Sequence, residues 1–222
     1  MLLNNDTIFT KNLINKILDF MDNNPGIGVS TPCIYSAISN RIWNCGGILT
    51  FFGSNIYYNS DKLINKKEGY LKISFITCCA TIFRKKILTK YGLLTEDYFF
   101  GEEDYEYSIR VRKNKVKMAG ILGTRLYHIE GVSSRKLKGK ELKFAFIHHL
   151  NRLVHMKSYY PKPIWEIWRF FIFIYLLLLL ILTHQIDLKT KIAYINKQFQ
   201  YSNKLMKVDK EPFMRIMNEK FE

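Results

Sequence analysis

Three consecutive acidic residues, Glu102, Glu103 and Asp104, have the types and spacing that could do chemistry in this chain. They follow an aromatic run and Gly101, and a helical pattern continues from them as far as Arg112. A glycine permits a sharp turn, and the free N–H groups of a first helical turn favour negative charge. Two interpretations are open: a helix start decorated with acids, or a pocket in which one carboxylate takes a proton from a substrate hydroxyl.

Four other segments accompany the acidic stretch Tyr98–Arg112 in a fixed order. Two of them are an Asn-Asn-Asp strand end in Leu2–Thr7 and a Cys-Cys-Ala-Thr turn, followed by a basic pair, in Thr77–Lys85. The other two are the Tyr-Gly-Leu-Leu-Thr-Glu segment Tyr91–Glu96, which leads into the acidic stretch, and a histidine before Gly-Val-Ser-Ser in Tyr127–Ser134. Together these segments resemble the family 2 inverting glycosyltransferases, which have the GT-A fold. The resemblance covers roughly residues 2–160, and five ordered elements are more specific than any one of them.

The resemblance implies an α/β fold, namely an incomplete GT-A-like domain that is doubly wound and Rossmann-like. The first half of such a domain binds the nucleotide base and ribose, and it would precede Leu2. Three explanations are open for its absence: an erroneous start site, a broken gene, or a separate partner chain that supplies it.

The reaction that the resemblance implies is transfer of a sugar from a nucleotide-diphosphate donor to an acceptor hydroxyl, with inversion. Asp104 would be the general base, and Glu103 would contact the acceptor or orient the base. Asp6 and His128 would bind a divalent cation, Mn²⁺ or Mg²⁺, that neutralises the diphosphate. The other implied substrate-binding residues are Asn4, Asn5, Cys78, Cys79, Glu102 and Arg110.

Neither implied metal ligand is specific by itself. An aspartate after an apolar strand, such as Asp6, is a common loop start, and a lone histidine such as His128 is often a satisfied structural residue at a strand end. His148 and His155 lie one heptad apart on one helical face, and we interpret them as interface residues because no third ligand accompanies them.

The composition favours acidic partners without pointing to nucleic acid. The 222 residues carry a net charge of +15, which suits phosphate-bearing substrates or anionic lipid, and no nucleic-acid-binding motif is found. With 48% hydrophobic residues the chain can form a domain with a core plus an appendage. The four cysteines contain no Cys-x-x-Cys motif, so we expect free thiols in a reducing cytosol.

The chain divides into three parts by pattern. Residues 1–160 would be the transferase portion, 161–186 a hydrophobic membrane-associated helix, and 187–222 a basic, weakly helical peripheral tail. Hydrophobic periodicity predicts helices over 10–24, 84–91 and 142–160. Strands are expected over 27–32 and 70–77, a polar loop over 55–69, and a strand pair over 116–126. The paired glycines of 42–49 favour a hairpin, with a close approach to ligand as the alternative.

The most apolar segment, Trp165–Thr183, favours membrane association after prolines 161 and 163 break the chain. Its uncharged part, Phe170–Thr183, is shorter than the roughly 20 residues that span a bilayer, so a spanning helix and a half-inserted helix are both open, and a buried core helix is the alternative to membrane association. The basic stretch Arg135–Lys143 would be a solvated loop or would contact phosphate or lipid.

The resemblance implies surface polysaccharide synthesis, of lipopolysaccharide or capsule, at the cytoplasmic face of a bacterial inner membrane, on a glycan or lipid-linked acceptor. The alternative is a non-catalytic membrane-associated fragment or partner subunit, and a third possibility is a basic membrane-surface binder unrelated to glycans.

Overall fold

The computed structural model describes residues 1–60, 69–129, 140–183 and 186–219. The chain forms two compact units: Met1–Thr95 with Glu103–Leu137, and Glu96–Glu102 with Lys138–Glu222. This division differs from the expected one, because the boundary expected at residue 160 falls inside the second unit. Part of the expected loop 55–69 and most of the basic stretch Arg135–Lys143 lie outside the described residues.

The first unit is built on a mixed sheet with one parallel pair at its centre, β3 (Ile27–Ser36) and β9 (Lys117–His128). Both strands are mostly buried, as expected where a sheet is covered on both faces. Their other partners are antiparallel: β8 (Ala80–Phe83) and β4 (Ile42–Asn44) on β3, β2 (Thr7–Phe9) and β7 (Tyr70–Ile73) on β9, and β1 (Leu2–Leu3) on β8.

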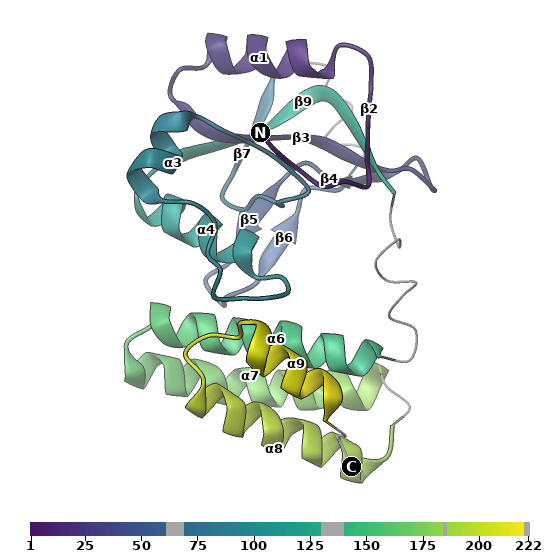
Figure 1. Ribbon diagram of the computed structural model, residues 1–222, viewed down its shortest axis with the longest axis vertical. Helices are drawn as coiled ribbons and strands as arrows, with labels where there is room; N and C mark the ends of the chain where they lie inside the picture. The colour runs from purple at the N-terminus through teal and green to yellow at the C-terminus, as the bar shows by residue number, and fades with distance from the viewer. Residues whose placement is uncertain (61–68, 130–139, 184–185, 220–222) are drawn as a thin grey trace. The chain divides into compact units, whose positions relative to one another are not determined.

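Helices cover both faces of this sheet (Figure 1). On one face α1 (Leu13–Asn23) packs buried residues at a spacing of four, Leu13, Ile17 and Met21, onto the strands. On the other face α3 (Lys85–Tyr91) and α4 (Glu103–Lys113) contribute Ile87, Tyr107 and Val111. The α/β class is therefore confirmed. The sheet differs from a doubly wound parallel one, since β3 and β9 are the parallel pair among the described strands.

Two glycine-marked segments fold differently from the expectation. The predicted hairpin about Gly46 and Gly47 is wrong: β4 pairs with β3, whereas β5 (Gly47–Leu49) pairs with β6 (Asn55–Tyr57). Gly46 has φ +78°, and it redirects the chain between these two partners. The strand pair predicted over 116–126 is one strand, β9, whose register with β3 shifts at two points along its length.

Gly120 provides a test of how tightly β9 packs. A Cβ at this position would lie 2.2 Å from the carbonyl oxygen of Cys45, which is backbone and cannot move aside. We expect Gly120→Ala to lower the free energy of unfolding by about 1–3 kcal/mol, the usual cost of overpacking. Urea denaturation measures this, with Gly26→Ala as the control because a Cβ there has no atom within 4 Å. Equal stability of the two variants would contradict the close approach.

Cys33 and Cys45 form a disulfide, so the prediction of free thiols is wrong for this pair. The cause is strand register: Ile34 of β3 pairs with Asn44 of β4, which brings the two neighbouring cysteines to a Cα separation of 4.2 Å. Cys78 and Cys79 are free thiols, as expected.

The second unit is a helical one. Its helices run nearly side by side in Figure 1: α6 (Glu141–Tyr159), α7 (Lys162–Thr183), α8 (Leu188–Lys204) and α9 (Lys210–Asn218). The predicted peripheral tail is wrong, because Tyr194 of α8 and Phe213 of α9 are buried in the core with Phe146 and Leu150 of α6. Pro163 lies in the first turn of α7, where its missing N–H costs no helical hydrogen bond, so it does not break the chain.

The segment Glu96–Glu102 joins the second unit although it precedes α4 in sequence. Backbone hydrogen bonds hold it there: Phe99 N–H donates to the Val208 carbonyl over 2.9 Å, and Val208 N–H donates to the Asp97 carbonyl over 2.8 Å. Gly101, at φ +74°, makes the sharp turn that the sequence predicts. Within the described chain, α7 is the helix long and apolar enough to cross a membrane, over Lys162–Leu182.

Candidate active site

The two predicted metal ligands meet at the carboxyl end of the parallel strand pair. His128 is the last residue of β9 and is paired with Ser36 at the end of β3. Thr7 of β2 pairs with His128, which places Asp6 next to it. Nε2 of His128 lies 3.2 Å from Oδ1 of Asp6. Ligands of open α/β sheets bind outside the carboxyl ends of the strands, so the position is one where a site is expected.

The 3.2 Å separation is that of a direct His–Asp contact, and the same two donor types also suit a divalent cation. Oδ1 of Asp6 and Nδ1 of His128 are buried and have no hydrogen-bond partner among the described residues. Two ligands bound at right angles to one cation, each at about 2.0–2.2 Å, are about 3 Å apart. No cluster of three or more His, Cys, Asp or Glu side chains forms within the described ranges. Asp6 and His128 would therefore hold a cation that takes its other ligands from water or from the phosphates of a substrate.

The His128 ring is oriented by a residue that the sequence did not identify. The Trp43 ring of β4 lies 4.8 Å from it, centroid to centroid, with 32° between the planes. This stacking fixes the plane of the imidazole and hence the direction of Nε2. The sequence around Trp43 does not indicate which side chain its ring contacts, so this contact is seen only in the folded structure.

Cys78 and Cys79 precede β8, and Cys79 is held against the segment that leads to Asp6. Asn4 N–H donates to the Cys79 carbonyl over 2.9 Å, because β1 is paired with β8. Burial, and then the charge of Asp6, raise the pKa of the Cys79 thiol to about 12. Burial, and then Asp104 and Glu103, raise the pKa of Cys78 well above the usual thiol range. The two thiols therefore stay protonated near neutral pH and are neither nucleophiles nor thiolate ligands.

The raised thiol pKa values make a chemical prediction. A thiol of pKa about 12 has roughly one thousandth of the thiolate of an ordinary thiol at pH 8. We expect Cys78 and Cys79 to resist iodoacetamide in the native chain and to react fully in urea. Peptide mass spectrometry after timed alkylation measures both sites, and the unfolded sample is the control. Rapid native alkylation of either thiol would contradict this placement.

Glu103 and Asp104 begin α4, as the sequence predicts, and a side-chain relay anchors that end of the helix. Ser108 Oγ donates to the Asp104 carbonyl over 2.6 Å and accepts from Ile76 N–H over 3.1 Å. Ile76 belongs to the segment that leads to Cys78. The charges of Glu103 and Asp104 influence the Cys78 thiol, and the charge of Asp6 influences the neighbouring Cys79 thiol.

Glu102 is placed differently from its two acidic neighbours. Its carboxylate is buried in the second unit, where Oε1 accepts from Nε of Arg152 over 2.6 Å and contacts Nδ1 of His155 over 2.9 Å. Burial by itself would raise the pKa of Glu102, but Arg152 and His155 hold it below its ordinary value. Because the side chain has no exposed surface, the implied contact of Glu102 with substrate is not supported. His155 is likewise part of this internal ion pair.

Arg110 is occupied by the protein itself. Its guanidinium pairs with Glu106, four residues earlier on α4, through N–O distances of 2.9 and 2.6 Å. It also donates to the carbonyls of Tyr91 and Leu93, over 2.6 and 2.8 Å. These contacts tie α4 to the segment after α3, and they do not favour the implied role in substrate binding. Asn4 and Asn5 have exposed side chains next to Asp6, and their substrate contacts stay predictions.

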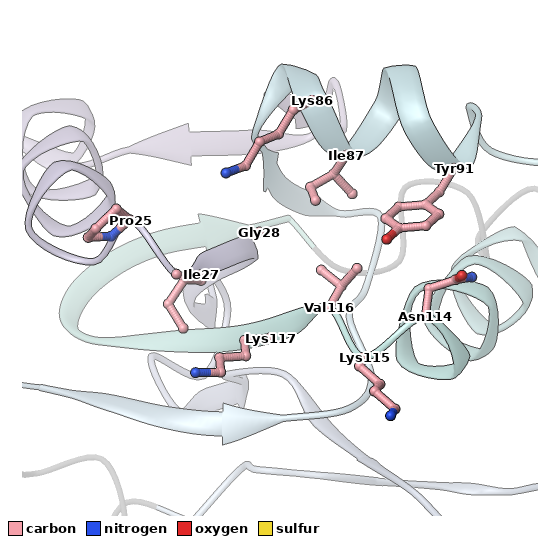
Figure 2. A pocket seen from close by; sticks show the side chains of 11 residues that line it. Pro25, Ile27, Gly28, Lys86, Ile87, Tyr91, Asn114, Lys115, Val116 and Lys117 are labelled. Carbon is pink, nitrogen blue, oxygen red and sulfur yellow. The ribbon is translucent and has the colours of Figure 1, made fainter.

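A pocket of about 260 Å³ lies at the opposite, amino ends of β3 and β9. Figure 2 shows Ile27 and Gly28 of β3 facing Val116 and the start of β9, with Lys86 of α3 above them. None of the predicted site residues lines it. The pocket and the Asp6–His128 pair therefore lie at opposite ends of β3 and β9.

No family model matches the chain, and no curated protein matches its sequence. The resemblance to the family 2 glycosyltransferases thus rests on the sequence segments alone.

Proposed function

We propose that this chain is a glycosyltransferase, or the acceptor-side and metal-binding portion of one. It would transfer a sugar from a nucleotide-diphosphate donor to an acceptor hydroxyl. One observation carries the proposal: Asp6 and His128, 122 residues apart in sequence, lie 3.2 Å apart at the carboxyl end of the parallel strand pair. A glycan or a lipid-linked acceptor, and a place in surface polysaccharide synthesis, belong to the same proposal.

Each residue would have a distinct task in the transfer. Asp104 takes the proton of the acceptor hydroxyl while that oxygen bonds to the anomeric carbon and the bond from this carbon to the diphosphate breaks. The amino end of α4 favours the ionised form of the base, and Glu103 orients the acceptor. When bound, a divalent cation neutralises the departing diphosphate. Asp6 and His128 hold the cation, and the Trp43 ring keeps His128 in position.

Binding of Mn²⁺ to the purified chain tests this proposal. We expect one Mn²⁺ site by electron paramagnetic resonance, and a loss of affinity of at least about 10-fold in Asp6→Ala and in His128→Ala. Asp22→Ala is the control, because Asp22 is an exposed carboxylate on α1. Unchanged Mn²⁺ affinity in both the Asp6→Ala and the His128→Ala variant would contradict the proposed metal site.

Turnover distinguishes an enzyme from a binding module. The same chain is incubated with a panel of nucleoside-diphosphate sugars and Mn²⁺, and release of the nucleoside diphosphate is measured. Metal-dependent release from one donor, lost in Asp6→Ala, supports the transferase. A chain that binds Mn²⁺ and cleaves no donor would instead match the non-catalytic alternative.

A further inference from the structure

The α7 helix presents an apolar stripe along its length. The stripe runs from Ile164 to Leu182 at helical spacing, and its exposed members include Phe170, Phe171 and Leu178. Of the window that is apolar enough to cross a membrane, 28% is buried, so α7 is not an enclosed core helix. Exposed apolar stripes of this extent mark contact with another molecule or with a membrane.

The opposite face of α7 is fastened within the second unit. Trp165 Nε1–H donates to the Leu153 carbonyl of α6 over 3.0 Å. Arg169, 6% exposed, binds Glu166 and the Asn203 side chain of α8, and its guanidinium lies over the Phe199 ring at 4.6 Å. Glu166 and Arg169 are the charged residues between Ile164 and Leu182, and they bind each other. The apolar members of the stripe carry no charge, and the Glu166 side chain beside them, 42% exposed, is paired with Arg169.

The chemistry of the stripe fits lipid better than a protein partner. Protein interfaces form about one hydrogen bond per 100–200 Å². The stripe is made of Ile, Leu and Phe side chains, and Tyr175 brings its only side-chain hydroxyl. A hydrocarbon phase needs no hydrogen bonds from the protein, so it can cover this surface without loss.

Packing against α8 decides how the helix meets the lipid. Arg169 contacts Asn203 and Phe173 contacts Phe199, so α8 runs antiparallel alongside α7. Near the middle of α8, Lys197 is paired with Glu219 over 3.3 Å. A membrane-spanning α7 would carry these charges into the hydrocarbon, which is strongly unfavourable. A helix in the plane of the membrane keeps α8 on the water side.

Exposed lysines lie at both ends of the stripe. Lys162 begins α7, and Lys189 is in the first turn of α8, close to the end of α7. In a chain of net charge +15 they suit the anionic head groups at a bilayer surface. We infer that α7 lies in the plane of an anionic membrane surface, with its stripe in the acyl boundary and α8 facing water. This inference goes beyond the proposed catalytic function and does not depend on it.

Co-sedimentation of the full chain with vesicles tests the inference. We expect binding to equimolar phosphatidylcholine and phosphatidylglycerol. The double variant Phe171→Glu with Leu178→Glu should bind at least about 100-fold more weakly, because the membrane would no longer bury these two apolar side chains. The matched control is Phe51→Glu with Leu93→Glu, which makes the same change at exposed positions of the first unit. No vesicle binding, equal loss in the control, or a soluble dimer dissociated by the stripe substitutions would overturn the inference.

Thiol labelling distinguishes an in-plane helix from a spanning one. Lys162→Cys and Lys189→Cys are bound separately to preformed vesicles and treated with a membrane-impermeant maleimide. Labelling of both variants to the same extent is the expected result, since both ends of α7 remain outside. Protection of one end alone would show that the helix spans, and would overturn the in-plane placement.

Discussion

Replacing Asp104 with Asn is expected to slow sugar transfer by about 10²–10⁴-fold, the usual contribution of a general base. The amide keeps the size of the side chain and its place in the first turn of α4, but it cannot take the proton of the acceptor hydroxyl. Release of the nucleoside diphosphate from the active donor measures the rate. Mn²⁺ affinity should stay unchanged, because Asp6 and His128 form the proposed cation site.

Asp22→Asn is the matched control for this variant. It makes the same chemical change at an exposed carboxylate on α1 and should turn over the donor normally. If Asp104→Asn retained near-normal turnover, the role of base would pass to Glu103 or the catalytic proposal would fail. The double variant Glu103→Gln with Asp104→Asn separates these outcomes.

Glu102→Gln should have a large effect of another kind, on stability. We expect the second unit to lose about 3–5 kcal/mol of its free energy of unfolding, as when one partner of a buried ion pair is removed. The substitution takes away the negative charge that faces Arg152 and His155. Urea denaturation followed by tryptophan fluorescence measures the loss, because Trp165 and Trp168 are buried in this unit.

A surface pair in the same unit provides the control. Lys207→Ala removes the exposed contact with Asp209, and a solvent-exposed pair of this kind contributes little to stability. The pH dependence gives a second readout. Since the folded-state pKa of Glu102 is lowered, its contribution is present above the ordinary value of 4.5 and is lost as the pH falls through the folded-state pKa. A Glu102→Gln chain as stable as the Lys207→Ala chain would contradict the assigned ion pair.

The sequence determined those features that depend on near neighbours in the chain. The spacing of Leu13, Ile17 and Met21 predicts α1, and Gly92 predicts the end of α3, where its φ is +84°. The Gly101 turn and the start of α4 at the acids were predictable in the same way. Helical periodicity and turn chemistry involve residues a few positions apart, so they can be read without the fold.

Contacts between distant segments were decided by the tertiary structure alone. Glu102 and Glu103 are consecutive acids, yet Glu102, at φ +75°, is buried against Arg152 while Glu103 begins α4 in the other unit. The disulfide of Cys33 and Cys45 likewise follows from the register of β3 with β4. The composition of these segments does not predict either the Glu102–Arg152 contact or the disulfide.

The proposed cation site combines both kinds of information. The resemblance to a known family singled out Asp6 and His128, whereas the residue pattern around each one left a structural role open. Their separation of 3.2 Å results from the pairing of β2 with β9, which joins residues 122 positions apart. The polar sequences of α8 and α9 suggested a peripheral tail, and only the packing of these helices shows that Tyr194 and Phe213 are buried. Strand register and helix packing depend on long-range burial and hydrogen bonding, which local sequence patterns do not encode.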